Sequence, residues 1–110
     1  MAAPGKDRLH GTLDALILKT LTFGPRHGYG IVRWLREQTR NGLPVEEGSL
    51  YPALYRMERD GWIDADWGTS ELGRTAKVYQ ITEKGRLQLR AQMQEFALFV
   101  RLVSPLLLPA

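Results

Sequence analysis

The hydrophobic pattern changes from a helical to a strand period near Gly61, and this change constrains the fold more than any other feature. Up to Met57 the apolar residues recur at the 3.6-residue period of α-helices. From Ile63 to Trp67 they alternate with aspartates, which is typical of a strand with one buried face. The chain therefore has to combine helices with a short β-segment in a fixed order.

Three helices are predicted before this point, over residues 12–23, 29–39 and 49–60. Each has apolar residues three and four positions apart and is followed by a turn that contains glycine. Ser49 is expected to cap the third helix, and Pro52 to lie in its first turn, where a missing N–H costs nothing. Residues 27–30 are expected to form a loop or a tight turn before the second helix.

A hairpin and a fourth helix follow. Residues 63–67 and 77–81 alternate as two strands, joined by the polar segment 68–75. Thr82 is then placed to cap a final helix that begins at Glu83. This order predicts a mostly α fold with a small β-hairpin, namely a winged helix-turn-helix followed by a C-terminal dimerisation helix. We expect residues 1–8 to be a flexible N-terminus, residues 9–82 to form the winged domain, and residues 83–110 to form the dimerisation helix and tail.

The composition fits one soluble domain and excludes several kinds of site. The chain has 110 residues, of which 44% are hydrophobic, and a net charge of +3 at pH 7, which permits an anionic partner. Its lack of cysteine excludes disulfides and thiolate metal sites. It has no HExxH pair, no glycine-rich phosphate loop and no paired carboxylates. We therefore expect no catalytic residue, no metal, no cofactor and no enzymatic activity.

The sequence shows no targeting segment and no segment able to span a membrane. The first nine residues include Lys6, Asp7 and Arg8 instead of an apolar run. The apolar stretch 96–108 contains Arg101 and Pro105 and is too short for a bilayer. We expect a cytoplasmic protein that does not enter a membrane.

The third predicted helix has an aromatic and basic face opposite its apolar stripe. At 100° per residue, the residues that point away from the stripe are Tyr51, Pro52, Tyr55, Arg56 and Arg59. Ser49 and the first-turn N–H groups are placed to bind a phosphate oxygen, and the tyrosines can contact phosphate or sugar. Arg56 can fork onto a guanine edge. These residue types favour DNA binding over a merely solvated surface, although a dimer partner could cover the tyrosines equally well.

The predicted wing, about residues 68–77, carries Arg74 and Lys77 and hydroxyl groups on Thr69, Ser70 and Thr75. Two cations at a hairpin tip suit contact with a DNA backbone or minor groove. Glu71 weakens this signal, and an ordinary solvated hairpin would look much the same. The predicted DNA-contacting residues are Ser49, Tyr51, Pro52, Tyr55, Arg56, Arg74 and Lys77.

The last predicted helix carries apolar residues at heptad spacing. From Leu89 they recur at intervals of 4, 3, 4 and 3 residues, which predicts a seam against another helix. A homodimer would bury this seam and provide the two-fold symmetry of a palindromic DNA site. The alternative is packing on the first helix of the same chain. The predicted interface residues are Leu89, Met93, Phe96, Phe99, Val100 and Val103.

Several short motifs, in order between residues 9 and 90, carry a resemblance to a known family. They are LHGTLD (9–14), HGYGI (27–31), EGSLYPAL (47–54), RDGWI (59–63), GR (73–74), KVY (77–79) and TEKG (82–85). With this combination the chain resembles the PadR-like transcriptional regulators, most closely the short members common in acidobacteria. The resemblance implies a homodimeric repressor that binds an inverted repeat in double-stranded DNA, with Tyr51, Arg74 and Lys77 on the DNA.

Some features stay open beside this resemblance. The family often has a second basic residue where this chain has Thr75, which lowers the expected contribution of the wing. Gly28 and Gly30 are expected to be structural, whereas His27 and Tyr29 could contact phosphate or pack inside the protein. The other function compatible with this fold is a protein-interaction module that dimerises without reading DNA.

In short family members an effector would have to bind at the dimer interface. Exposed aromatic side chains would favour a small apolar or aromatic ligand. Packing in the core would, however, explain most of the aromatic residues. The aromatic residues considered for this role are Trp34, Trp62, Trp67, Phe96 and Phe99.

Overall fold

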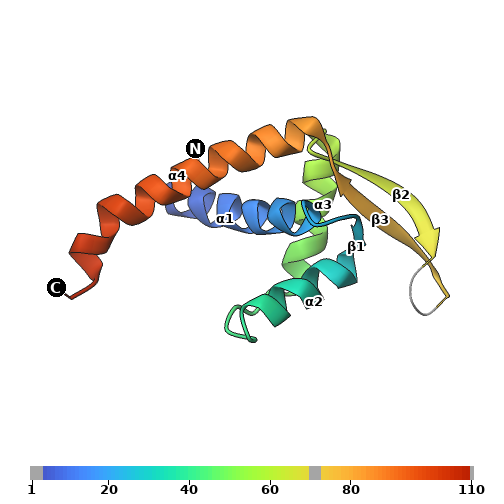
Figure 1. Cartoon of the computed structure of the whole chain (residues 1–110), viewed down its shortest axis with the longest axis horizontal. Helices are drawn as coiled ribbons and strands as arrows, with labels where there is room; N and C mark the ends of the chain where they lie inside the picture. Colours follow the sequence, from blue (N-terminus) through green and yellow to red (C-terminus); the bar gives the residue numbers. More distant parts are fainter. Residues whose placement is uncertain (1–3, 70–72, 110) are drawn as a thin grey trace.

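The predicted fold class is confirmed. The computed structural model describes residues 4–69 and 73–109, with side chains from residue 12 onward. In chain order its elements are α1 (Pro4–Leu21), β1 (Arg26–His27), α2 (Gly28–Gln38), α3 (Glu47–Arg59), β2 (Ile63–Thr69), β3 (Thr75–Ile81) and α4 (Glu83–Leu107). The hairpin of β2 and β3 extends from one end of the helical body, and α4 runs back over α1 toward the other end (Figure 1). Part of the predicted wing, residues 70–72, lies outside the described residues.

The core lies where α1, α2 and α3 meet the sheet. The predicted apolar stripe of α3 is buried, with Leu50, Leu54 and Met57 fully inaccessible. Ile63 of β2 and Ile81 of β3 close the core from the side of the sheet. Each large side chain buried in this way contributes about 1.5–3 kcal/mol of transfer free energy. The core therefore fixes which face of α3 is turned outward.

The sheet has a strand that the sequence pattern did not predict. β2 and β3 pair as an antiparallel hairpin from Ile63↔Ile81 to Thr69↔Thr75, and β1 pairs with the other edge of β3. β1 has two residues, too few to show an alternation. His27, expected in a loop, is therefore held in the sheet, and α2 begins directly after it.

Two helices begin earlier than predicted. α1 starts at Pro4, so residues 4–8 are helical instead of a flexible segment, whereas residues 1–3 lie outside the described part of the chain. The prediction began only where the buried stripe begins, but a helix can extend beyond its buried stripe, and proline is favoured in its first turn.

The start of α3 also differs from the prediction. α3 begins at Glu47, with Glu46 at the N-cap position, and the Ser49 N–H donates to the Glu46 carbonyl at 3.1 Å. Ser49 is therefore the third residue of the helix and not its cap, and Pro52 lies inside the helix. Glu46 and Glu47 place negative charge at this end, which weakens the case for a phosphate at the N-terminus of α3.

The beginning of α4 agrees with the prediction. The Thr82 hydroxyl accepts a hydrogen bond from the Gly85 N–H at 3.0 Å and so caps the helix. At Gly85 the helix passes so close to the Trp62 carbonyl that a Cβ atom would collide with it. Within the described residues, no helix has both the length and the apolar character needed to cross a membrane.

Candidate functional site

The outward face of α3 exposes aromatic side chains. Tyr55 is 71% exposed and Tyr51 is 45% exposed, and Ser49 and Pro52 are also exposed. Their orientation follows from the burial of Leu50 and its neighbours on the opposite face. The predicted contact residues of α3 are thus accessible, with one exception.

The exception is Arg56, which forms an ion pair within the chain. Its two terminal nitrogens donate to the carboxylate of Asp14 on α1, at 2.7 and 2.9 Å. The hydrogen bond to Asp14 is the main reason that the pKa of Arg56 is raised. Because both arms of the guanidinium hold Asp14, Arg56 would have to break this ion pair to fork onto a guanine edge as predicted. Arg56 instead ties α3 to α1.

A signal for this ion pair was present in the sequence. Asp14 precedes Ile17, Leu18 and Leu21 at intervals of 3, 4 and 7 residues, so it belongs to the buried stripe of α1. The Asp14 residue is 3% exposed. A carboxylate in such a position requires a cationic partner, although the spacing alone does not identify which one.

Tyr51 packs across the start of α2. A Cβ atom at Gly28 would lie 2.7 Å from the Tyr51 Cε1 atom and 2.9 Å from its hydroxyl oxygen. Gly28 is therefore structural, as expected. A glycine is needed there because the Tyr51 side chain approaches closely, and not because the backbone is left-handed. Gly30 shows no comparable approach, since its nearest neighbour would be in ordinary contact at 3.6 Å.

Tyr79 of β3 lies behind Tyr51. Burial raises the pKa of the Tyr79 phenol, with smaller contributions from Glu58 and Tyr51. The phenol therefore stays neutral near neutral pH. Together, Gly28, Tyr51 and Tyr79 join α2, α3 and the sheet at the base of the wing.

An open groove of about 720 Å³ lies between the start of α2, Tyr51 and the wing. Among the described residues, its lining includes the cations Arg26, Arg33, Arg74 and Lys77, and Glu37 as the one acidic residue. We call it the basic groove. Duplex DNA presents closely spaced phosphates, so a groove with this balance of charge is suited to a DNA backbone.

The basic groove also contains residues that sequence reasoning missed or left open. Arg26 and Arg33 were not predicted, because β1 was not recognised and only His27 and Tyr29 were considered for phosphate contact around the start of α2. The Arg26 Nε and His27 Nδ1 atoms are buried without a hydrogen-bond partner among the described residues. Tyr29, by contrast, is 60% exposed at the rim and not packed in the core.

Lys77 is partly engaged by a neighbour. Its ammonium lies 3.6 Å from the Glu58 carboxylate, and both side chains are more than a third exposed. Exposed pairs of this kind contribute only about 0–1 kcal/mol. Lys77 can therefore exchange Glu58 for a phosphate at small cost. Arg74 is exposed near the end of the wing, at the edge of the described residues.

The predicted dimer seam divides into two parts. Leu89 is 6% exposed and belongs to the core of its own chain, so its assignment to a dimer interface is corrected. The reason is that the first half of α4 packs along α1. Residues 93–108 form the distal half of α4 and the residue after it, where Met93, Phe96, Phe99 and Val100 are 39–54% exposed. Val103 is half-buried.

The aromatic residues considered for an effector site do not form one cluster. Trp34 and Trp62 pack against the core, and Trp34 also contacts Phe23, with ring centroids 5.4 Å apart. Trp67 is 66% exposed on β2, whereas Phe96 and Phe99 lie on the distal half of α4. In the described parts of the chain, no group of three or more His, Asp or Glu residues could hold a metal ion.

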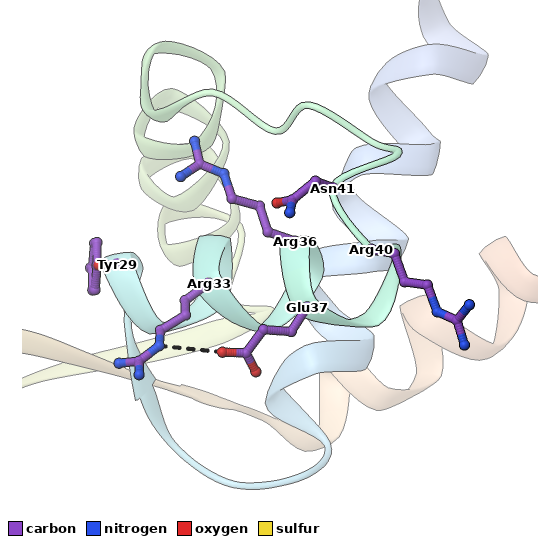
Figure 2. Close-up of a pocket in the computed structure, with 6 residues that line it drawn as sticks. All are labelled: Tyr29, Arg33, Arg36, Glu37, Arg40 and Asn41. Carbon is purple, nitrogen blue, oxygen red and sulfur yellow. Dashed lines mark hydrogen bonds and ion pairs between the residues drawn. The ribbon is translucent and has the colours of Figure 1, made fainter.

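A second hollow, of about 410 Å³, lies on the outward face of α2. It is lined by Tyr29, Arg33, Arg36, Glu37, Arg40 and Asn41. Figure 2 shows these side chains along α2, with Tyr29 at the end nearest the strands and Arg40 at the opposite end, and with Arg33 paired to Glu37. Of these residues, only Tyr29 was considered for a functional role from the sequence.

Comparison with known proteins gives a consistent result. The model of the transcriptional regulator PadR-like family matches residues 17–91. A transcriptional regulator from Clostridium thermocellum superposes with a TM-score of 0.83 at 28% identity, covering 92% of this chain and 98% of that one. The PadR-like transcriptional regulator of Bacillus cereus gives a TM-score of 0.76 at 32% identity, covering 94% and 99%. An uncharacterised protein of Lysinibacillus sphaericus is 32% identical over 91 residues, which are 83% of this chain and 84% of that protein.

Proposed function

Since the chain belongs to the PadR-like family of transcriptional regulators, we propose that it represses transcription by binding an inverted DNA repeat as a homodimer. The family consists of transcriptional regulators, which supports the expectation that the chain is not an enzyme. Each protomer would place α3 in a major groove and the wing beside it, as winged helix-turn-helix proteins do.

The observation that carries this proposal is the basic groove. Tyr51 of α3 and the cations Arg26, Arg33, Arg74 and Lys77 line one open surface, and Tyr55 is exposed one helical turn after Tyr51. A groove lined by four cations and one described acidic residue matches a phosphate backbone better than it matches an average protein surface. Within α3, Tyr51 and Tyr55 are the residues that we assign to DNA, while Arg56 supports the helix from behind.

The exposed apolar surface of α4 supports the dimer that this proposal requires. The exposed apolar residues of the distal half are arranged along one helix, and a second copy would bury them. The two-fold axis of such a dimer would present two copies of α3 to the two halves of an inverted repeat. An effector of apolar or aromatic chemistry would enter beside Phe96 and Phe99, between the two α4 helices.

The experiment is a binding titration of the purified protein with the DNA upstream of its own gene, over a series of salt concentrations. Direct phosphate contacts should make log K fall linearly with log salt, with a slope of about 0.9 for each neutralised phosphate. A scrambled duplex of the same length and composition is the control for specificity. Binding that is flat in salt, or equal for both duplexes, would support the protein-interaction module instead.

A further inference from the structure

The outward face of α2 has three arginines, and two of them, Arg36 and Arg40, lie outside the basic groove. Arg33, Arg36 and Arg40 lie along it, and the one acidic residue among them, Glu37, pairs with Arg33 at 3.3 Å. The face thus has a net charge of +2, from three arginines and one glutamate. We call these residues the arginine face of α2.

The arginine face is continuous with the basic groove. Tyr29, Arg33 and Glu37 line both hollows, so the two surfaces meet at the first two turns of α2. Arg33 and Arg36 are about 4.5 Å apart along α2 at 1.5 Å per residue, and Arg40 follows two residues after the end of the helix; successive phosphates of one DNA strand are separated by a rise of about 3.4 Å. The cations therefore follow each other at a spacing that suits a phosphate row.

Arg40 occupies a position where an arginine is unfavourable for folding. Its φ angle is +50°, in the left-handed region, at the position after the C-cap Thr39, and Asn41 that follows is also left-handed. Glycine is the usual residue at this point of a helix, because it has no Cβ atom to strain the backbone. Folding alone does not explain an arginine here, whereas a role for its guanidinium does.

We propose that the arginine face of α2 is a second phosphate-binding surface, which extends the DNA contact of each protomer beyond α3 and the wing. This inference rests on the proposed function. The occupant is the DNA backbone and not an acidic protein, because the face continues a groove that already has the charge and shape for DNA. Arginine is also the cation best suited to fork onto a phosphate.

The test compares three proteins on the upstream DNA of the gene: the wild type, Arg40→Gly, and Arg36→Gln/Arg40→Gly. For each, the hydroxyl-radical footprint, the salt slope of binding and the melting temperature are measured. Arg40→Gly should melt at the same or a higher temperature, since glycine relieves the left-handed residue, yet bind more weakly. The double variant should shorten the footprint by about two nucleotides per half-site and lower the salt slope by about two units.

Arg36 also donates to the Val45 carbonyl at 3.5 Å, so its replacement alone could disturb the segment before α3. The single variant Arg40→Gly avoids this difficulty. The matched control is Arg86→Gln/Arg90→Gln, which removes the same charge from exposed positions of α4. This control should keep the wild-type footprint and most of the salt slope.

The outcomes separate the two proposals. If the wild type binds specifically and the double variant keeps its footprint and slope, the arginine face does not contact DNA and this inference is overturned, while the proposed function stands. The same holds if the α4 control loses as much binding as the α2 variants, because net charge would then explain the loss. If the wild type does not bind the duplex specifically, the proposed function fails first.

Discussion

The basic groove and the distal half of α4 are both exposed, yet they offer opposite chemistry. The groove is lined by arginine, lysine and tyrosine, whereas residues 93–108 of the tail are mainly Leu, Phe and Val. Apolar surface is stabilised by removal from water, at about 25 cal/mol per Å², with little dependence on salt. Cations on a phosphate row are stabilised by release of counterions, which salt suppresses. Salt should therefore weaken DNA binding steeply and dimerisation little.

The first prediction concerns the apolar surface on the distal half of α4. Phe96→Asp places a charge in the proposed interface, and a two-fold interface contains the change twice. We expect dimerisation to weaken by about 4 kcal/mol, or about a thousandfold, and specific DNA binding to be lost with it. Analytical ultracentrifugation measures the first effect and the titration described above the second. A variant that stays dimeric would show that another surface holds the two copies together.

Leu89→Ala sharpens the same comparison, because Leu89 lies on the same helix but is buried in its own chain. It should lower the free energy of unfolding by about 3 kcal/mol, as loss of a buried leucine side chain does. The dimerisation constant of the folded protein should change little. Thermal unfolding measures the first quantity and sedimentation the second. Unchanged stability with weakened dimerisation would show that Leu89 belongs to the dimer interface.

The next prediction separates residues that face DNA from one that supports the helix behind them. Arg56→Ala leaves the buried Asp14 carboxylate without its partner, so the free energy of unfolding should fall by about 3 kcal/mol. The apolar double variant Asp14→Leu/Arg56→Met should recover part of this loss. Chemical denaturation measures both. If Arg56→Ala kept full stability and relaxed preference at one base pair, Arg56 would read DNA after all.

A smaller effect is expected at Gly28. The Cβ atom of Gly28→Ala would push the Tyr51 ring aside, since the two would lie 2.7 Å apart. Because the ring is partly exposed and can move, stability should change by less than about 1 kcal/mol, while DNA affinity should fall about tenfold. Tyr51→Phe is the companion variant, as it keeps the ring in place and removes only the hydroxyl. Unchanged affinity in Gly28→Ala would exclude Tyr51 from the contact.

The smallest effect is expected at the base of the wing. Lys77→Gln should reduce affinity about threefold on every duplex and lower the salt slope by about one unit. Glu58→Gln should act in the opposite direction, because it releases Lys77 and removes a negative charge 3.6 Å from it. The salt titration measures both variants. If Lys77→Gln changed preference for particular bases, the wing would read sequence and not only phosphate.

An element of the fold could be predicted from the sequence when the spacing of nearby residues specifies it. The helices, the hairpin and the Thr82 cap follow from residues close together in the chain, and all of them occur. β1 was missed because two residues are too few for a period. The helix start at Glu47 was missed because serine is a stronger cap signal than glutamate.

The candidate site was harder to predict, because its decisive contacts connect distant residues. Arg56 and Asp14 are 42 positions apart, so the helical wheel showed Arg56 pointing outward but not what it meets there. The heptad spacing of α4 identified an apolar stripe but not that α1 covers its first part. Spacing gives the direction of a side chain, whereas its partner depends on tertiary packing.

The length of α4 has a mechanical consequence. This helix of 25 residues is about 37 Å long, and its first residue follows directly on Thr82 and the end of β3. If the distal half of α4 packs against a second copy, a tilt of the helix by about 5° would move its first residue by about 3 Å for this length. The wing is attached at that end, so in the proposed dimer the angle between the two α4 helices would set the distance between the two wings. A molecule that binds between the two α4 helices would thus change the distance between the wings without contacting the DNA-facing surface.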